Sequence, residues 1–161
     1  GADEVDIVLN VGRMLTGEYD EAANEVEVIR TEMDDDVVLK VIIESGALKT
    51  PELIRKASLL SMLAGADFVK TSTGKIDVAA TPEAAVVMCQ AIRDYYDKTG
   101  RKVGFKAAGG ISTSKDAVCY HSIVKSILGN DWLNKGLFRF GVSRLANSLM
   151  SSIEQKTVAY F

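Results

Sequence analysis

Short runs of strand-forming residues recur along this chain at a nearly constant spacing, and this repeat constrains the fold more than any other feature. The five runs start 33, 30, 35 and 35 residues apart. They are rich in valine, isoleucine, leucine and phenylalanine, most of which are enriched in β-strands. The predicted strands are Glu4 to Leu9, Val37 to Ile43, Asp67 to Thr71, Lys102 to Lys106, and Leu137 to Gly141.

Helical patterns lie between the predicted strands, and several begin with a start signal. Thr50-Pro51 and Thr81-Pro82 precede two of them, and Ser112-Thr113-Ser114 precedes a third. A capping hydroxyl and a proline in the first turn both favour helix initiation. Strict alternation of strand and helix predicts parallel strands joined by right-handed crossovers, in either a doubly wound sheet or a closed barrel.

The polar residues of the predicted strands distinguish these two folds. Charged or small residues share one parity, and the other parity is apolar, so each strand has one polar face. A doubly wound sheet would be apolar on both faces, because helices cover both. We therefore favour an α/β fold of the TIM-type (β/α)8 barrel class, with the charged residues inside. The inward residues are Glu4, Asp6, Lys40, Glu44, Lys70, Gly104, Lys106, Arg139 and Gly141.

The length of the chain limits how much of a barrel it can supply. Eight βα units need about 250 residues, whereas this chain has 161. Five predicted units fill it, and we interpret them as barrel strands 4 to 8. Residues 1–161 are therefore expected to form the C-terminal part of a single barrel domain, with the opening three strands absent from this chain.

Composition argues against several other classes of protein. The net charge is -3 and the basic residues are scattered among acidic ones, so nucleic-acid binding is not expected. No apolar run approaches the ~20 residues of a membrane span. Cys89 and Cys119 form no CxxC or Cys/His cluster, which argues against disulfides and a zinc site. We predict a cytoplasmic protein that uses no metal ion or other cofactor.

Lys70 lies near the C-terminal end of the third predicted strand, on its inward face. Barrel enzymes place catalytic groups at this end of their strands. An inward lysine must be paired, deprotonated or at the barrel mouth, because burying an unpaired ammonium is costly. An ion-pair network would be the default interpretation of a single inward lysine.

Lys106 changes this interpretation, because it lies at the equivalent point of the next strand, and parallel neighbours are ~4.8 Å apart. A neighbouring positive charge disfavours protonation, so one of the two amines is expected to be uncharged and nucleophilic near neutral pH. The alternative is that Glu4, Asp6 and Glu44 neutralise both lysines.

Two glycine-containing segments follow the last two predicted strands. Gly109-Gly110 follows the fourth and Gly141-Val142-Ser143-Arg144 follows the fifth, and both lead into helices. Loops after strands seven and eight of such barrels often bind phosphate through backbone N–H groups. Together with Lys75 and Arg144, these segments predict a phosphorylated substrate.

These motifs resemble those of the deoxyribose-phosphate aldolase family across essentially the whole chain. The matching segments are GADEVDIV, LKVIIESG, GADFVKTSTGK, ATPE, KVGFKAAGG and FRFGVS. The resemblance implies that Lys70 forms a Schiff base, that Lys106 favours its neutral form and relays protons, and that Asp6 is an acid/base residue. It also implies substrate or phosphate binding by Thr71, Thr73, Lys75, Gly109, Gly110, Gly141 and Ser143.

The chain departs from the family pattern in three ways. It lacks the first three strands and their polar side chains. Ala107 stands where the family often has proline, and Arg144 stands where some members have a second serine and could add a charge-assisted phosphate contact. Some members also use a C-terminal tyrosine in proton transfer, and Tyr160 is the candidate here; helix packing explains the end of the chain equally well.

The resemblance implies a metal-independent class I aldolase that reversibly cleaves 2-deoxy-D-ribose 5-phosphate to acetaldehyde and D-glyceraldehyde 3-phosphate. One alternative is an inactive barrel fragment that needs an N-terminal partner segment, since an open sheet exposes its edge strand. Another is a different phosphate-binding barrel, such as an isomerase or a synthase, which leaves the paired lysines unexplained. A homodimer, or association with the missing segment, is the expected assembly.

Overall fold

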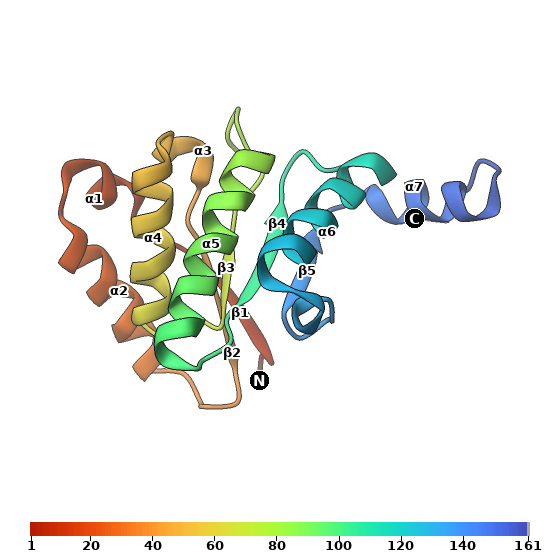
Figure 1. Cartoon of the computed structure of the whole chain (residues 1–161). Helices are drawn as coiled ribbons and strands as arrows, with labels where there is room; N and C mark the ends of the chain where they lie inside the picture. The colour runs from red at the N-terminus through yellow and green to blue at the C-terminus, as the bar shows by residue number, and fades with distance from the viewer. Residues whose placement is uncertain (161) are drawn as a thin grey trace.

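The computed structural model describes residues 1–160 as one sheet of parallel strands alternating with helices (Figure 1). The strands are β1 (Glu4–Val8), β2 (Val38–Ile42), β3 (Phe68–Lys70), β4 (Gly104–Ala108) and β5 (Phe138–Gly141). The helices are α1 (Val11–Thr16), α2 (Tyr19–Thr31), α3 (Ser45–Leu48), α4 (Pro51–Leu63), α5 (Pro82–Thr99), α6 (Ser114–Leu128), the 3-10 helix η1 (Asn130–Trp132) and α7 (Leu145–Glu154).

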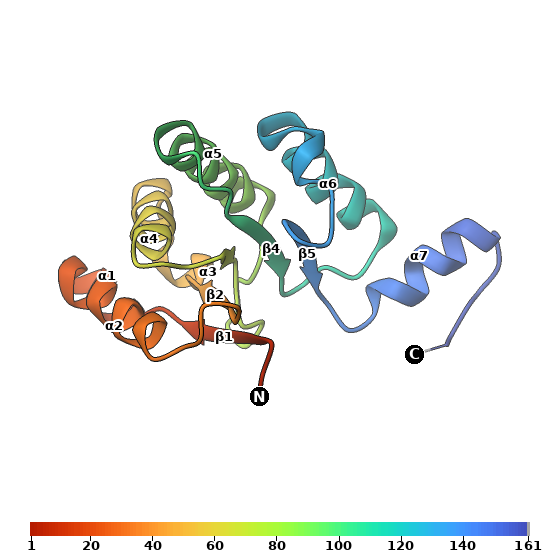
Figure 2. The same cartoon turned by 90° about the horizontal axis from the view of Figure 1, so that it is seen from below.

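The five strands lie in sequence order, β1-β2-β3-β4-β5, and every neighbouring pair is parallel. Seen from below, the sheet forms an arc with α1, α2, α4, α5 and α6 along its outer side (Figure 2). Helices on one face only are the arrangement of a barrel wall, not of a doubly wound sheet. This confirms the predicted partial βα-barrel.

The hydrophobic core lies between the sheet and its outer helices. Leu39, Val41, Val69 and Phe105 of the central strands have no exposed surface, and all have the parity predicted to face the helices. Side chains of the edge strands β1 and β5 are only partly covered on that face, as at Ile7 and Phe138.

Phe68 is an exception to the predicted parity, because it is apolar and shares the inward face with Lys70. It is 3% exposed, and its ring occupies the space that a side chain at Gly104 of β4 would need: a Cβ there would lie 2.3 Å from the ring. The Arg139 guanidinium packs over the Phe68 ring, with its central carbon 5.1 Å from the ring centroid. Glycine at position 104 is thus required by packing inside the arc.

The helix start signals of the sequence operate as predicted. Thr50 and Thr81 accept hydrogen bonds from Leu53 N and Ala84 N, with proline next to each cap. Thr113 and Asp116 form a reciprocal capping box at α6. These caps satisfy N–H groups that the first turn of a helix leaves unpaired.

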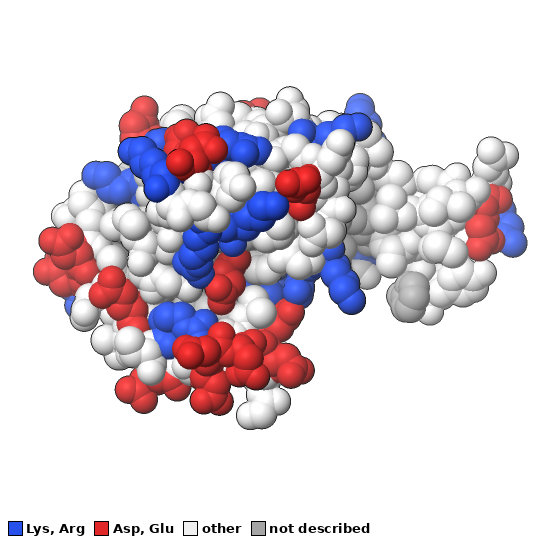
Figure 3. Space-filling view, turned by 60° about the horizontal axis from the view of Figure 1, so that its bottom comes forward, with Lys and Arg blue, Asp and Glu red and all other residues white. Residues whose placement is uncertain are grey.

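The end of the sheet where the strands begin carries ion pairs that hold neighbouring elements together. The Asp67 carboxylate, just before β3, accepts hydrogen bonds from Arg101 at 2.8 Å, Arg30 at 3.4 Å and the backbone N of Leu39 at 2.9 Å. Acidic and basic side chains gather at this end of the molecule (Figure 3). In barrels this face serves stability, because the chemistry lies at the C-terminal ends of the strands.

Helix α7 projects away from the sheet (Figures 1 and 2). Contacts to the start of α6 hold it, where Ser114 hydrogen-bonds Ser148 and Ser152 of α7. None of the helices in residues 1–160 combines the length and the apolar character needed to cross a membrane.

Candidate active site

Lys70 and Lys106 lie side by side on the inner face of the arc. They are register partners across β3 and β4, as their equivalent positions in the two strands predict. Their side chains are 14% and 17% exposed, so both amines are mostly shielded from solvent. Neither lysine reaches out over the rim.

Asp6 of the edge strand β1 reaches both lysines through one carboxylate oxygen. Its Oδ2 accepts hydrogen bonds from Lys70 Nζ at 2.7 Å and from Lys106 Nζ at 2.9 Å. The other carboxylate oxygen, Oδ1, is 3.2 Å from Lys40 Nζ. The structure therefore brings together the three residues predicted to carry the chemistry, with both lysines within hydrogen-bond distance of the Asp6 carboxylate.

The alternative in which carboxylates neutralise the lysines is realised only in part. Asp6 pairs with both lysines, but Glu4 pairs with Lys40 at 2.7 Å and with Arg139 at 2.6 Å. The Glu4–Arg139 pair joins β1 to β5, the two edges of the sheet, which shows how strongly the sheet curves. Counted as charges, the ion-paired cluster around Glu4 and Asp6 has four cations, Lys40, Lys70, Lys106 and Arg139, against these two carboxylates.

The excess of positive charge lowers the pKa of both carboxylates. Partial burial acts to raise the pKa of Asp6, but hydrogen bonds from Lys70, Lys106 and Lys40 outweigh it and hold the pKa well below its usual range. Hydrogen bonds from Arg139 and then Lys40 lower the pKa of Glu4 to about 2. Asp6 is thus an anion in the resting site.

Lys40 is a site residue that sequence reasoning did not select. It is 2% exposed, and its ammonium joins the carboxylates of Glu4 and Asp6. The inward parity of β2 placed it on the correct face, but its strand position gave no reason to prefer it over the other inward residues. We assign it a positioning role, because it holds the Asp6 carboxylate from the side opposite the two lysines.

Glu44, two residues after the end of β2, holds the loop that follows β3. Its carboxylate accepts hydrogen bonds from Thr73 N at 2.8 Å and from Thr73 Oγ1 at 2.6 Å. Partial burial acts to raise the pKa of Glu44, but hydrogen bonds from Ser72 and Thr73 lower it overall. The backbone of Glu44 is left-handed, with φ 54°, a conformation that is uncommon for a residue with a side chain.

Thr71 does not line the site as predicted. Its side chain is fully buried, and its hydroxyl both donates to Ala108 O at 2.8 Å and accepts from Ala108 N at 2.9 Å. These bonds extend the pairing of β3 with β4 past the last strand residue, Lys70. Thr71 therefore fixes the direction in which the next residues leave the sheet.

A polar pocket of about 500 Å³ lies at the C-terminal ends of β4 and β5. It brings together most of the predicted phosphate-binding residues from three separate loops. Backbone N–H groups, a hydroxyl and a guanidinium in one concavity suit an anionic group. The predicted residues in its lining are Thr73, Gly109, Gly110, Gly141, Ser143 and Arg144.

Two glycines of this pocket have no room for a side chain. A Cβ at Gly141 would lie 2.7 Å from Ala108 Cβ and 3.2 Å from Lys106 Cε, so this glycine also leaves space for the Lys106 side chain. Gly109 has φ 91°, and a Cβ there would lie 2.5 Å from Ala79 Cβ. Since Gly141 touches both the pocket and the Lys106 side chain, the pocket and the lysine pair share a wall.

Two further predicted residues lie outside this pocket. Lys75 is exposed on the loop after β3, and its backbone N donates to Thr73 Oγ1 at 3.2 Å. Tyr160 is 64% exposed and its backbone N donates to Asn147 of α7 at 3.0 Å, on the part of the chain that projects from the sheet. A role of Tyr160 in proton transfer stays a prediction.

The described residues, 1–160, contain no group of three or more His, Cys, Asp or Glu side chains that could hold a metal ion. Of the two free cysteines, Cys89 is buried and Cys119 is exposed. Burial raises the pKa of the Cys89 thiol, which suits a packing role rather than a reactive one.

Comparison with known proteins identifies similar sequences for most of the chain. A family model described as "DeoC/LacD family aldolase" matches residues 1–131. The deoxyribose-phosphate aldolase of Mus musculus is 47% identical over 156 residues, and that of Homo sapiens is 45% identical over the same length. Each alignment covers 97% of this chain and 48% of the relative. The chain thus spans about half the length of the curated relatives it matches.

Solved structures share the arrangement of strands and helices. A protein from Coccidioides immitis described as a candidate deoxyribose-phosphate aldolase matches with a TM-score of 0.77 and 31% identity, over 95% of this chain and 53% of that one. A similarly described protein from Toxoplasma gondii matches with a TM-score of 0.84 and 22% identity, over 96% of this chain and 61% of that one. The latter similarity concerns the fold alone.

Proposed function

We propose, from the premise that this chain belongs to the DeoC/LacD family of aldolases, that its site makes and breaks carbon–carbon bonds through a Schiff base on Lys70. The observation that carries this proposal is the pair of register-matched lysines sharing one oxygen of Asp6. Such a cluster provides an amine nucleophile, a second amine and a carboxylate that can all act on one bound substrate.

The proposed substrate is 2-deoxy-D-ribose 5-phosphate. Two observations support it: the relatives at 47% and 45% identity are deoxyribose-phosphate aldolases, and a polar pocket with Arg144 and Ser143 adjoins the lysines. The phosphate would occupy this pocket while the aldehyde carbon of the sugar meets Lys70. The products are acetaldehyde and D-glyceraldehyde 3-phosphate.

The reaction begins when the uncharged amine of Lys70 attacks the aldehyde carbon. Lys40 and Lys106 also bind Asp6, so this carboxylate keeps cationic partners when the Lys70 amine leaves it to react. The carbinolamine then loses its oxygen as water and becomes an iminium ion. The iminium withdraws the electron pair of the bond between the second and third sugar carbons, so the bond breaks and leaves an enamine.

Proton transfer is the proposed work of Asp6 and Lys106. The third-carbon hydroxyl must lose a proton as the bond breaks, and the carbinolamine oxygen must gain protons to leave as water. Asp6 accepts from both lysines, so a proton can pass among the three groups without movement of the backbone. The enamine then takes a proton at its terminal carbon, and hydrolysis releases acetaldehyde and the free lysine. The iminium acts as the electron sink, so the mechanism uses no metal ion or cofactor.

Borohydride trapping tests the Schiff base. Protein incubated with acetaldehyde and reduced with sodium borohydride should carry an N-ethyl group on Lys70, located by mass spectrometry of its peptides. Lys70→Arg should abolish the adduct. Lys75→Arg, five residues along the chain on the exposed loop, should leave it intact and serves as the matched control. An adduct spread evenly over surface lysines would contradict the assignment.

A second proposal concerns what the chain needs in order to act. The sheet of residues 1–160 is an open arc with edges at β1 and β5, and the chain spans about half of its relatives. We propose that further βα units close this arc in the active protein. The assay is aldol formation from acetaldehyde and D-glyceraldehyde 3-phosphate by the 161-residue chain alone. Full activity would refute the need for additional units.

A further inference from the structure

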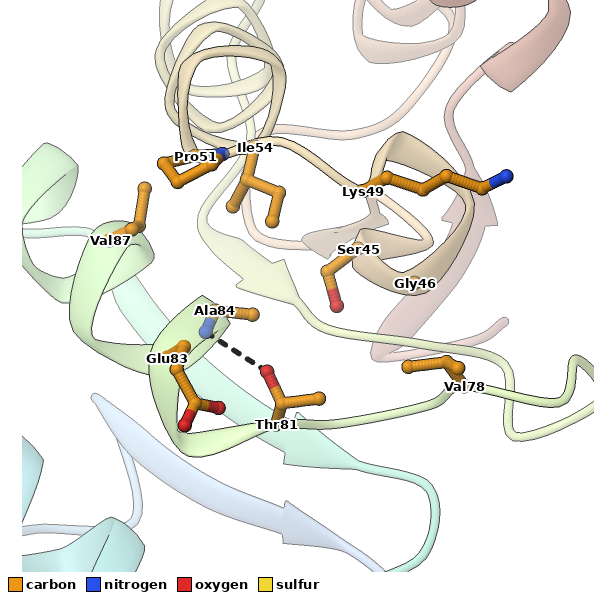
Figure 4. A pocket seen from close by; sticks show the side chains of 10 residues that line it. All are labelled: Ser45, Gly46, Lys49, Pro51, Ile54, Val78, Thr81, Glu83, Ala84 and Val87. Carbon is orange, nitrogen blue, oxygen red and sulfur yellow. Dashed lines mark hydrogen bonds between the residues drawn. The ribbon is translucent and has the colours of Figure 1, made fainter.

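A second pocket, of about 390 Å³, lies outside the arc, between the turn after β2 and the first turns of α4 and α5 (Figure 4). It shares no lining residue with the polar pocket described above. Its walls come from α3, α4, α5 and the loop before α5, and they are mainly apolar. The apolar lining residues are Pro51, Ile54, Val78, Ala84 and Val87.

Ser45 places a polar group inside this apolar pocket. The residue is 2% exposed, and within residues 1–160 its hydroxyl has no hydrogen-bond partner. The side chain points into the space between α3 and α5 in Figure 4. A buried hydroxyl without a partner costs free energy, whereas other buried hydroxyls of this chain are satisfied: Ser58 donates to Ile54 O and Ser61 to Ala57 O, each at 2.8 Å.

The charges around the pocket favour an uncharged occupant. Lys49 contributes its stem, and its ammonium points away from the cavity (Figure 4). Glu83 stands at the start of α5 and is exposed, so its carboxylate would repel an anion. The Thr81 hydroxyl already accepts from Ala84 N as the cap of α5, whereas the buried Ser45 hydroxyl has no partner within residues 1–160.

From these features we infer that the pocket binds a small neutral molecule with an apolar body and one hydroxyl or carbonyl group. The volume is within the range of small-molecule sites, about 300–1,000 Å³. The apolar body would contact Ile54, Ala84 and Val87, and its oxygen would pair with the Ser45 hydroxyl. This inference does not depend on the proposed aldolase reaction.

The position of the pocket connects it to the loop of the candidate active site. Ser45 follows Glu44, the residue that holds Thr73, and the backbone N of Ser45 donates to Thr71 O at 2.9 Å. Val78, on the other wall, belongs to the same loop and is so close to α3 that a Cβ on Gly46 would lie 1.8 Å from Val78 O. An occupant therefore contacts Ser45, next to the residue that holds Thr73, and Val78 of the loop itself. Its binding should shift the NMR signal of the Thr73 amide.

Benzyl alcohol and toluene are the probes that test this site, titrated against the intact chain and followed by NMR. Both should shift the signals of Ile54, Val78, Ala84 and Val87, and the Thr73 amide should move with them. Ser45→Ala should weaken benzyl alcohol binding by about 2- to 10-fold, the value of one hydrogen bond, and leave toluene binding unchanged. Ser58→Ala, which removes a satisfied hydroxyl on α4, is the matched control and should change neither affinity.

Stability measurements and a blocking variant complete the test. Ser45→Ala should leave the urea midpoint unchanged or raise it, because no hydrogen bond is lost, whereas Ser58→Ala should lower it. Val87→Phe should fill the pocket and abolish binding of both probes. Equal benzyl alcohol affinity in the wild-type chain and Ser45→Ala, or shifts scattered outside the pocket, would overturn the inference. Probe binding that leaves the Thr73 amide signal unmoved would overturn the inferred connection between the pocket and the loop after β3.

Discussion

The carboxylate of Asp6 organises the candidate site at the scale of single residues. One oxygen serves the two lysines of β3 and β4, and the other faces Lys40. This division fixes the orientation of the carboxylate, because each oxygen has its own cationic partners. The same arrangement holds Lys70 near a group that can take up or return a proton, as the proposed imine chemistry requires.

Glu4 provides a test of these electrostatics through acid stability. Its pKa is lowered from 4.5 to about 2 by Arg139 and Lys40, so the unfolded chain binds more protons between these values. The stabilisation is therefore fully present above pH 4.5 and is lost as the pH falls towards 2. Because the side chain is one-third exposed, we expect Glu4→Gln to cost only about 1 kcal/mol at pH 6.

The measurement is urea unfolding at pH 6, 4.5 and 3. The difference between the wild-type chain and Glu4→Gln should shrink as the pH falls. Glu27→Gln, on the exposed side of α2, is the control and should change stability by less than about 0.5 kcal/mol at every pH. A difference for Glu4→Gln that grows on acidification would show that the ion pairs to Arg139 and Lys40 do not form.

At the scale of elements, the central strands place one layer of side chains inside the arc and another against the helices. The inner layer is crowded on the N-terminal side of the lysines, where Phe68 of β3 fills the space beside Gly104 of β4. Towards the C-terminal ends of the strands, Gly141 of β5 leaves space for the Lys106 side chain. Glycine is thus used on two neighbouring strands so that a large neighbouring side chain can fit.

Gly104→Ala should destabilise the chain, since the new methyl group would lie 2.3 Å from the Phe68 ring and displace it. We expect the free energy of unfolding to fall by about 1–3 kcal/mol. The control is Gly12→Ala in α1, where the nearest atom to the added Cβ is 3.4 Å away. Alanine there should stabilise the helix by up to about 1 kcal/mol. Thermal or urea unfolding of both variants measures the sign of each change in the free energy of unfolding. Stabilisation by Gly104→Ala would show that the Phe68 ring does not lie against position 104.

At the scale of the whole fold, residues 1–160 form an arc of five parallel strands whose outer face is covered by helices. In the part of the chain that the structure describes, β1 and β5 each have a neighbour on one side only. An unpaired strand edge exposes N–H and C=O groups that can pair with another chain. The Glu4–Arg139 pair closes part of the gap with side chains, but it does not satisfy these backbone groups.

We therefore expect the 161-residue chain by itself to associate with increasing concentration. Sedimentation velocity at about 5 to 200 μM should show a rising average mass. Adding the segment that would supply the remaining βα units should reduce this association and increase aldol formation together. A chain that stays monomeric throughout this range would contradict the interpretation that its strand edges are accessible.

The sequence by itself determined the repeat of strand and helix, the polar face of each strand and the neighbouring positions of Lys70 and Lys106. These depend on local periodicity and on the pairing of consecutive strands, which short stretches of sequence specify. The two glycine segments were likewise predictable, because both follow strands at the same edge of the sheet.

Only the tertiary structure decided which groups these residues meet. Asp6 and Lys106 are 100 residues apart in the chain, and their hydrogen bond depends on how strongly the whole sheet curves. The same curvature selects Lys40 as a partner of Asp6 and joins Glu4 to Arg139. The Thr71 hydroxyl bonds the backbone of Ala108 because the extension of β3 stays close to β4. Sheet curvature and the packing around it are summed over many residues, so no single motif reveals them.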